Sequence, residues 1–257
     1  MIVDGGFGCD GGKGRGMIRA IALAVALFGV SGVGAEVQYP RIISFSGYNW
    51  SVKTSHGKVG PGPNYFSDST NSVWVDAQGR LHMKILKDRN RWNCSEVILQ
   101  ASLGYGTYRF YLDSAVDALD PNVVLGLFTW NDVPDYNHRE IDIEFSRWGQ
   151  VNNLNAQYVV QPYNLPQNIF RWQDPAGLPQ STHSFNWATS SVFLQSLKGL
   201  NATPPDPSYI IQQQTLSNGI PVPGGENARI NLWLNGGHAP TNGQAVEVII
   251  NRFEFAP

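Results

Sequence analysis

Five residues near the middle of the chain alternate acid with isoleucine, in the order Glu140-Ile141-Asp142-Ile143-Glu144. Successive side chains of a strand point to opposite faces, so this pattern predicts a strand with carboxylates on one face and isoleucines on the other. Neighbouring carboxylates repel one another, and acidic residues have low strand propensity. Carboxylate chemistry in a cleft is the interpretation that explains why a fold would keep them together.

Hydrolysis of a glycosidic bond is one reaction that uses two carboxyl groups, one on each side of the bond. On a flat strand the Cα atoms of Glu140 and Glu144 would lie ~13 Å apart. A retaining pair needs ~5–5.5 Å between carboxyl groups and an inverting pair ~6.5–9.5 Å. Two Glu side chains on a concave face can close much of that gap, so the spacing leaves the stereochemistry open. Asp142 between them would raise the pKa of a neighbour and hold a shared proton.

Two other interpretations of the acid strand stay open at this point. Carboxylate oxygens are ligands that Ca²⁺ prefers, although a straight strand wraps an ion poorly. The acids can also form a solvated face without function, but the apolar run 123–130 that precedes them is typical of a strand buried on both faces, which argues against a sheet edge.

The rest of the chain from residue 40 onwards predicts strands and turns, with almost no helical periodicity. The 73–75 and 81–85 segments flank Asp-Ala-Gln-Gly and predict a hairpin. Short strands at this spacing favour an all-β sandwich of two antiparallel sheets, a β-jelly roll, in a single domain at 36–257. Residues 199–228 are rich in Pro, Gly and Asn and predict a long connection. Further strands are expected at 96–99, 104–112, 154–160, 182–187, 192–197, 230–234 and 246–255.

The composition fits a protein that handles a neutral polymer outside the cell. Charged residues make up 15% of the chain, against ~25% in typical domains. The net charge of −2 gives no reason to expect nucleic acid or an anionic membrane as partner. We expect a monomer that acts on a neutral polysaccharide.

The first 35 residues are predicted to be a leader that contains a signal peptide. Met17 begins a short basic start, residues 20–30 form an apolar run, and small residues lead to a cleavage site after Ala35. The apolar run is too short to span a bilayer. Met17 is the expected true start, and the mature protein is expected to be secreted, with Cys94 as its one cysteine.

The segment 140–145 resembles the catalytic signature of glycoside hydrolase family 16, whose members include lichenases, laminarinases, agarases, carrageenases and xyloglucan transglycosylases. Other matches follow in the same order along the chain. Glu96 precedes a Gly-Tyr-Gly strand at 104–106, a Phe-Thr-Trp segment ends at Trp130, and Asn231-Leu232-Trp233 lies near the end. The resemblance covers residues 92–255 and implies the β-jelly roll of that family, which is similar to concanavalin A.

The resemblance implies a role for each acid. Glu140 would be the nucleophile, Glu144 the general acid/base and Asp142 the residue that tunes both, with net retention. One residue separates Asp142 from Glu144, as in lichenases and xyloglucan-active members, which favours a β-1,3-1,4-glucan or a related β-glucan. Lichenase-like members often have Arg two residues after the acid that Glu96 matches, whereas this chain has Ile98. That departure leaves the substrate open.

Aromatic and polar side chains supply the candidate sugar contacts. Sugar rings stack their apolar faces on aromatic rings, while their hydroxyls need polar partners. Trp74 and Trp187 are expected in the core, and His183 as a core histidine. The expected cleft residues are Glu96, Trp92, Trp130, Tyr136, Trp148, Gln157, Trp172 and Trp233.

Three questions remain open from the sequence. The proposed chemistry needs no cofactor, and a structural Ca²⁺, common in the family, has no assigned ligands. A transglycosylase of the same fold would pass the glycosyl group to another sugar instead of water. A non-catalytic carbohydrate-binding protein would keep the cleft without turnover, although the presence of all the motif acids disfavours it.

Overall fold

The computed structural model describes residues 36–257, so the predicted leader lies outside the described residues. Within this range the chain forms strands and short 3₁₀ turns. The strands are β1 (Val37–Phe45), β2 (Tyr48–Ser55), β3 (Tyr65–Phe66), β4 (Val73–Val75), β5 (Leu81–Asp88), β6 (Arg91–Leu99), β7 (Gly106–Leu112), β8 (Val123–Trp130), β9 (Ile141–Phe145), β10 (Ala156–Val160), β11 (Ile169–Trp172), β12 (Ser181–Trp187), β13 (Val192–Lys198), β14 (Ile210–Leu216), β15 (Asn227–Leu234) and β16 (Val246–Ala256). The 3₁₀ turns are η1 (Asn137–Arg139), η2 (Pro207–Tyr209) and η3 (Asn235–Gly237).

One layer of the fold carries the acid strand. Its strands follow the order β11-β10-β9-β8-β15-β6, and β2 and β1 extend it beyond β6. All of these pairs are antiparallel. β9 therefore lies inside the sheet, between β8 and β10, and is not at a solvated edge.

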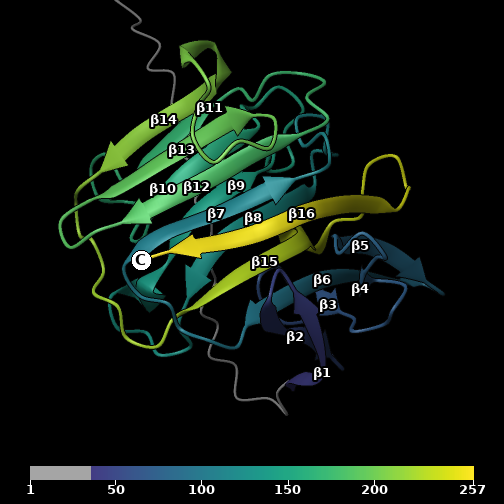
Figure 1. The fold of residues 1–257 in the computed structure, drawn as a ribbon. Coiled ribbons are helices and arrows are strands. Elements are labelled where there is room, and N and C mark those ends of the chain that lie inside the picture. Colours follow the sequence, from purple (N-terminus) through teal and green to yellow (C-terminus); the bar gives the residue numbers. More distant parts are fainter. Residues whose placement is uncertain (1–35) are drawn as a thin grey trace, which may run out of the picture.

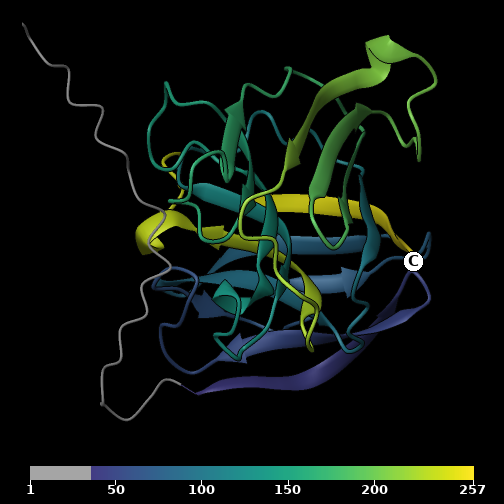
Figure 2. The same cartoon turned by 90° about the vertical axis from the view of Figure 1, so that its left-hand side faces the viewer.

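The second layer follows the order β5-β16-β7-β12-β13-β14, with β4 paired to β5 (Figure 1). The start of β6 also pairs with the end of β5, so the two layers join there. The N-terminal strands (purple) and the green strands of the second layer lie at opposite ends of the molecule in both views (Figure 2). The predicted two-sheet jelly-roll sandwich is confirmed.

Side chains from both layers meet in the core. Phe145 of β9 contacts His183 of β12 with ring centroids 4.6 Å apart. Tyr158 of β10 hydrogen-bonds Ser196 of β13 at 2.6 Å between the hydroxyl oxygens. His183 is fully buried, as expected for a core histidine. These contacts fix the height of β9 and β10 above the second layer, and so the position of the acids on their outer face.

Several predicted strands are confirmed, because their sequence patterns match the faces that the fold buries. β8 is buried along nearly its whole length and has the bounds that the apolar run predicts. β4 and β5 form the expected hairpin, with Trp74 opposite His82. β6 begins at Arg91, earlier than the predicted 96–99 segment, because its first residues pair with β5.

The prediction of one long connection at 199–228 is wrong, because this segment contains β14. Among the strands of residues 36–257, β14 pairs with β13 alone and is a sheet edge. Three consecutive Gln residues, 212–214, occupy its middle and leave no apolar alternation to detect. Within residues 36–257 no helix is long and apolar enough to cross a membrane.

Candidate active site

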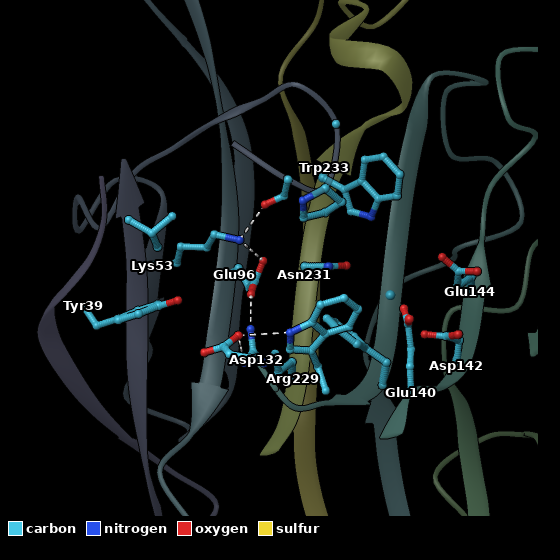
Figure 3. Close-up of a pocket in the computed structure, with 17 residues that line it drawn as sticks. Tyr39, Lys53, Glu96, Asp132, Glu140, Asp142, Glu144, Arg229, Asn231 and Trp233 are labelled. Atoms are coloured by element: carbon cyan, nitrogen blue, oxygen red, sulfur yellow. Dashed lines mark hydrogen bonds and ion pairs between the residues drawn. The ribbon is translucent and has the colours of Figure 1, made fainter. Parts of the chain in front are cut away.

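The acid strand holds its carboxyl groups in one cleft. The side chains of Glu140, Asp142 and Glu144 line a cleft of about 310 Å³ on the outer face of the first layer. Ile141 and Ile143 are fully buried on the other face, in the core. The predicted alternation is therefore present: apolar packing on one face fixes the strand, and the carboxyl groups share the other face (Figure 3).

Burial raises the pKa of Glu140 and Asp142, because a buried carboxylate loses its hydration. Burial and the charge of Glu144 raise the pKa of Glu140 to about 8, while a hydrogen bond with Asp142 and the charge of Arg229 act in the opposite direction. The pKa of Asp142 is raised well above its usual value by burial, then by the charges of its two acidic neighbours. The raised pKa of Asp142 favours its protonated form, and Asp142 and the charge of Arg229 are the neighbours that favour ionisation of Glu140 against the effect of burial.

Glu144 is held by a chain of two hydrogen bonds. The Arg171 Nε donates to Gln157 Oε1 at 2.9 Å, and Gln157 Nε2 donates to Glu144 Oε2 at 2.6 Å. Burial raises the pKa of Glu144 to about 7, although the bond from Gln157 and the charge of Arg171 lower it. A carboxyl group with that pKa exchanges its proton near neutral pH, as a general acid/base must. Gln157, predicted as a sugar contact, is therefore buried outside the lining of the cleft and hydrogen-bonds an acid of the motif, with its amide oriented by Arg171.

A left-handed turn leads into Glu140. Residues 136–139 all have positive φ, from 51° at Tyr136 to 62° at His138, and none of them is Gly. The buried Arg139 fixes this turn: its Nε donates to the Val222 carbonyl at 2.9 Å and its Nη1 to the Asp135 carbonyl at 3.3 Å. Left-handed backbone costs roughly 1–2 kcal/mol per residue for L-amino acids. Arg139 points away from the acids and holds the chain that delivers Glu140.

Glycine forms the floor of the cleft between the acid strand and β15. Gly126 of β8 lies directly opposite both Glu144 and Asn231. A Cβ atom at Gly126 would lie 2.5 Å from Asn231 Oδ1. The absence of a side chain at 126 lets the Asn231 amide lie on the floor, where its Oδ1 is buried and has no hydrogen-bond partner.

An ion-pair network faces the acid strand across the cleft. Glu96 Oε2 accepts from Lys53 Nζ at 2.8 Å, and Glu96 Oε1 lies 3.5 Å from Arg229 Nη1. Arg229 Nη2 also pairs with Asp132 at 3.1 Å (Figure 3). Lys53, Glu96 and Arg229 are buried, whereas Asp132 is exposed at the rim. Two cations therefore neutralise Glu96 and the rim carboxylate, so this side of the cleft adds little negative charge to the acid strand.

Arg229 supplies a guanidinium where Ile98 departs from the family pattern. Ile98 and Arg229 are directly opposite each other on β6 and β15. The Arg229 Nε is buried without a hydrogen-bond partner, as is Asp142 Oδ2. Unpaired buried polar atoms are costly, and those of Arg229, Asn231 and Asp142 all belong to side chains that line the same cleft. A ligand with many hydroxyl groups would satisfy them.

Two tryptophans form aromatic walls. Trp130 lines the cleft, donates from Nε1 to Asp132 at 3.0 Å and stacks on His138 with centroids 4.0 Å apart. His138 covers one of its faces, which leaves the other for a sugar. Trp233 lines the cleft as well, and its ring packs edge-on against Trp148 with centroids 6.1 Å apart.

The structure places the remaining predicted contact residues outside this cleft. Trp148 packs behind Trp233 and is buried. Trp172 is buried against Tyr158, with centroids 4.2 Å apart. Tyr136 is exposed, beneath the Arg139 guanidinium. Trp92 lines a different pocket.

Trp74 and Trp187 were both predicted to lie in the core, and one of them does. Trp187 is buried, as expected. Trp74 is half-buried on the second layer and stacks on His82 with centroids 4.4 Å apart.

Several cleft residues escaped sequence reasoning. Tyr39 and Lys53 come from β1 and β2, far from the motif, and no local pattern marks them. Arg229 and Asn231 share one face of β15 with the predicted Trp233. The period of two that revealed the acid strand would therefore also have placed them in the cleft. Gly126 gives a weaker signal, as an isolated glycine inside an apolar strand.

No metal centre emerges from the part of the chain that the structure describes. Residues 36–257 contain no group of three or more His, Cys, Asp or Glu side chains arranged to hold a metal ion. A structural Ca²⁺ therefore stays a prediction without assigned ligands.

Comparison with known proteins gives structural matches only. No protein-family model matches the sequence, and no curated protein matches it. A β-glucanase of Bacillus licheniformis has a similar structure, with a TM-score of 0.60 and 19% identity over 89% of this chain and 100% of that one.

Two mycobacterial structures are also similar. A β-1,3-glucanase of Mycobacterium marinum has a TM-score of 0.58 and 16% identity, over 80% of this chain and 90% of that one. A Mycobacterium tuberculosis protein, described as an immunostimulatory antigen and pseudo β-1,3-glucanase, has a TM-score of 0.57 and 18% identity, over 81% of this chain and 91% of that one. At these identities the likeness establishes the shared fold.

Proposed function

We propose that the chain is a member of glycoside hydrolase family 16 and hydrolyses a β-linked glucan with retention of configuration. The observation that carries the proposal is the acid strand itself, with three buried carboxyl groups in one cleft and Glu144 near neutral pKa. The fold is shared with glucanases, among them the Bacillus licheniformis protein. The sequence motif around Glu140 supports the same assignment.

In the proposed mechanism Glu140 attacks the anomeric carbon while Glu144 protonates the departing glycosidic oxygen. The bond from the anomeric carbon to the leaving oxygen breaks as the bond to the Glu140 carboxylate forms. Glu144 then removes a proton from water, which attacks the same carbon and releases Glu140. Asp142 again hydrogen-bonds Glu140 when the negative charge of Glu140 reappears. Each of the two displacements inverts the anomeric carbon, so the product has net retention.

The cleft residues other than the acids bind and orient the sugar chain. Trp130 and Trp233 offer ring faces to the apolar faces of the sugars. Asn231 and Arg229 offer a buried acceptor and a buried donor to hydroxyl groups. The cleft extends from β9 across to β1, and its lining from Glu144 to Tyr39 suits an extended chain, which supports cleavage within a polysaccharide.

Product analysis on plain polysaccharides tests the proposal. We expect the protein to release short oligosaccharides from barley mixed-linkage glucan or laminarin, with xyloglucan, agarose and carrageenan as the comparison panel. Longer products that contain the added acceptor sugar would indicate a transglycosylase. Binding without any release would indicate a carbohydrate-binding protein. The similar Mycobacterium tuberculosis protein is described as a pseudo β-1,3-glucanase, which is why this alternative is tested.

The pH profile is expected to report on the bonds to Glu144. Its proton must be in place for the first step, so activity should fall as pH rises through the pKa of Glu144, which is about 7. The bond from Gln157 and the charge of Arg171 both favour the ionised form. Replacing Arg171 by Met removes both influences in part, so the pKa rises and the basic limb of the kcat/KM profile moves to higher pH.

A matched control uses another cation that lies away from the cleft. Lys198→Met removes the same charge at the end of β13 and should leave the profile in place. Arg171→Lys should restore part of the wild-type profile, since the charge returns without the full geometry. A basic limb that stays in place, or moves to lower pH, in Arg171→Met would contradict this role.

A further inference from the structure

A group of basic side chains without polar partners lies at the join between the two layers. Most Lys and Arg side chains in residues 36–257 make an ion pair or a hydrogen bond. Those that make neither are Lys58, Lys87, Arg89, Arg91 and Lys198. All of them except Lys198 belong to the β5–β6 hairpin or to the segment that faces it.

Three of these basic side chains line a second pocket of about 490 Å³. Lys58, Arg89 and Arg91 line it together with the rings of Tyr65 and Trp92. Asp88 is the one acidic side chain of the lining, so the lining carries a net positive charge. The pocket is thus cationic in a protein whose net charge is −2.

The walls of this pocket are fixed by the fold. Asn64 is buried, and its Nδ2 donates to the carbonyls of Pro61 and Leu234 at 2.8 Å each. A Cβ atom at Gly237 would lie 2.5 Å from the Pro63 carbonyl oxygen, so the chain after β15 packs closely against the same segment. The pocket is therefore built before any ligand binds.

The pocket and the acid cleft share one wall. Gly60, Pro61 and Gly62 line the cleft, and Pro63 and Asn64 line the second pocket. Along β6, Glu96 lies in the cleft and Trp92 in the pocket, four residues or ~13 Å away. A polysaccharide bound in the cleft would have this pocket beside it.

The chemistry of the lining is that of a site for an acidic sugar. The Arg91 guanidinium lies 4.8 Å from the centre of the Tyr65 ring, which orients it and leaves its N–H groups free for an oxyanion. Trp92 is half-buried and provides a surface for a sugar ring. Asp88 can accept hydrogen bonds from sugar hydroxyls, a role that the backbone of DNA does not require.

We propose that this second pocket binds a sugar that carries a sulfate or carboxylate group. The oxyanion contacts Lys58, Arg89 and Arg91, while the ring lies against Trp92. This binding does not require the acid cleft to hydrolyse any substrate. Through this pocket the protein would bind acidic polysaccharides, in addition to the neutral chain expected in the cleft.

Binding of dextran derivatives tests this site apart from the cleft, because dextran has α-linkages. Calorimetry with the full protein should detect dextran sulfate and carboxymethyl-dextran, with neutral dextran far weaker. Comparison of the two derivatives shows which oxyanion the pocket prefers. The triple variant Lys58→Ala/Arg89→Ala/Arg91→Ala should bind the better derivative with an affinity reduced by about tenfold or more. Lys198→Ala should bind it like the wild type.

The aromatic contribution separates a sugar site from a plain charged surface. Trp92→Ala should weaken binding of the dextran derivative and leave binding of poly-glutamate unchanged, with the circular dichroism spectrum confirming the fold. Equal loss for Lys198→Ala, no loss for the triple variant, or equally tight binding of duplex DNA would overturn the proposal. Hydrolysis of neutral glucan by the triple variant should stay at the wild-type rate, so failure of the cleft assignment and failure of this site are distinguishable.

Discussion

Replacement of Glu140 by Gln is expected to reduce hydrolysis of the glucan by about 10³-fold or more while the protein still folds and binds the polysaccharide. The amide keeps the shape of the carboxyl group but cannot attack the anomeric carbon. Glu140 is buried among other acids, and a neutral amide removes one repulsive charge, so we expect the free energy of unfolding to stay the same or rise. Release of reducing ends measures the rate, and calorimetry on the intact polysaccharide measures binding.

A second variant shows whether Glu140 acts as nucleophile. In Glu140→Ala the space left open admits azide, which should attack the same face of the anomeric carbon and give a glycosyl azide of inverted configuration. Glu247→Gln, on the second layer beside His82 and Lys84, is the matched control and should leave the rate unchanged. Full activity in Glu140→Gln would show that the nucleophile is another group.

Replacement of Glu144 by Ala is expected to reduce hydrolysis of natural glucan by about 10²–10⁴-fold. A sugar leaving group needs the proton that Glu144 supplies, whereas an aryl leaving group such as dinitrophenolate departs without one. The variant should therefore retain much more of its first-step rate on an aryl glycoside than on glucan. The two rates are compared in the same buffer, by absorbance of the released phenolate and by reducing ends.

The pH profile gives an independent readout for the same variant. Because the basic limb reflects loss of the Glu144 proton, this limb should disappear from the first step in Glu144→Ala. Gln157→Leu is the comparison: it keeps the acid, removes its hydrogen-bond donor, and should move the limb to higher pH. Equal losses on both substrates, with the limb retained, would contradict the acid/base role.

The parts of the fold that could be predicted are those in which one strand carries its own signal. The acid strand and β8 alternate or repeat apolar residues over their whole length, because their faces are buried by neighbours on both sides. The hairpin of β4 and β5 is marked by its turn residues. β14 carries no such signal, because as an edge strand its middle residues are polar.

The candidate site was predictable along the acid strand and, away from it, at single residues such as Glu96, Trp130 and Trp233, but the contacts between its parts were not. The partners of Glu96 come from β2 and β15, at sequence separations that no local pattern spans. Gln157 and Arg171 meet Glu144 because β9, β10 and β11 are neighbours in the sheet, and this order follows from tertiary structure. The tryptophans show the same limit: Trp130 and Trp148 are both near the motif, yet one lines the cleft and the other packs behind Trp233.

The left-handed turn at 136–139 has a consequence for how this protein tolerates change. Four such residues at roughly 1–2 kcal/mol each amount to a large share of the net stability of a typical domain. Strain of this size persists only where the surroundings enforce it, here through Arg139 and the carbonyl of Val222. A glycine in the turn would relax the backbone and allow the residue before Glu140 to adopt other conformations. A substitution that relaxes this turn is therefore expected to raise stability and lower activity. A search for more heat-resistant variants is expected to find this trade-off in the turn.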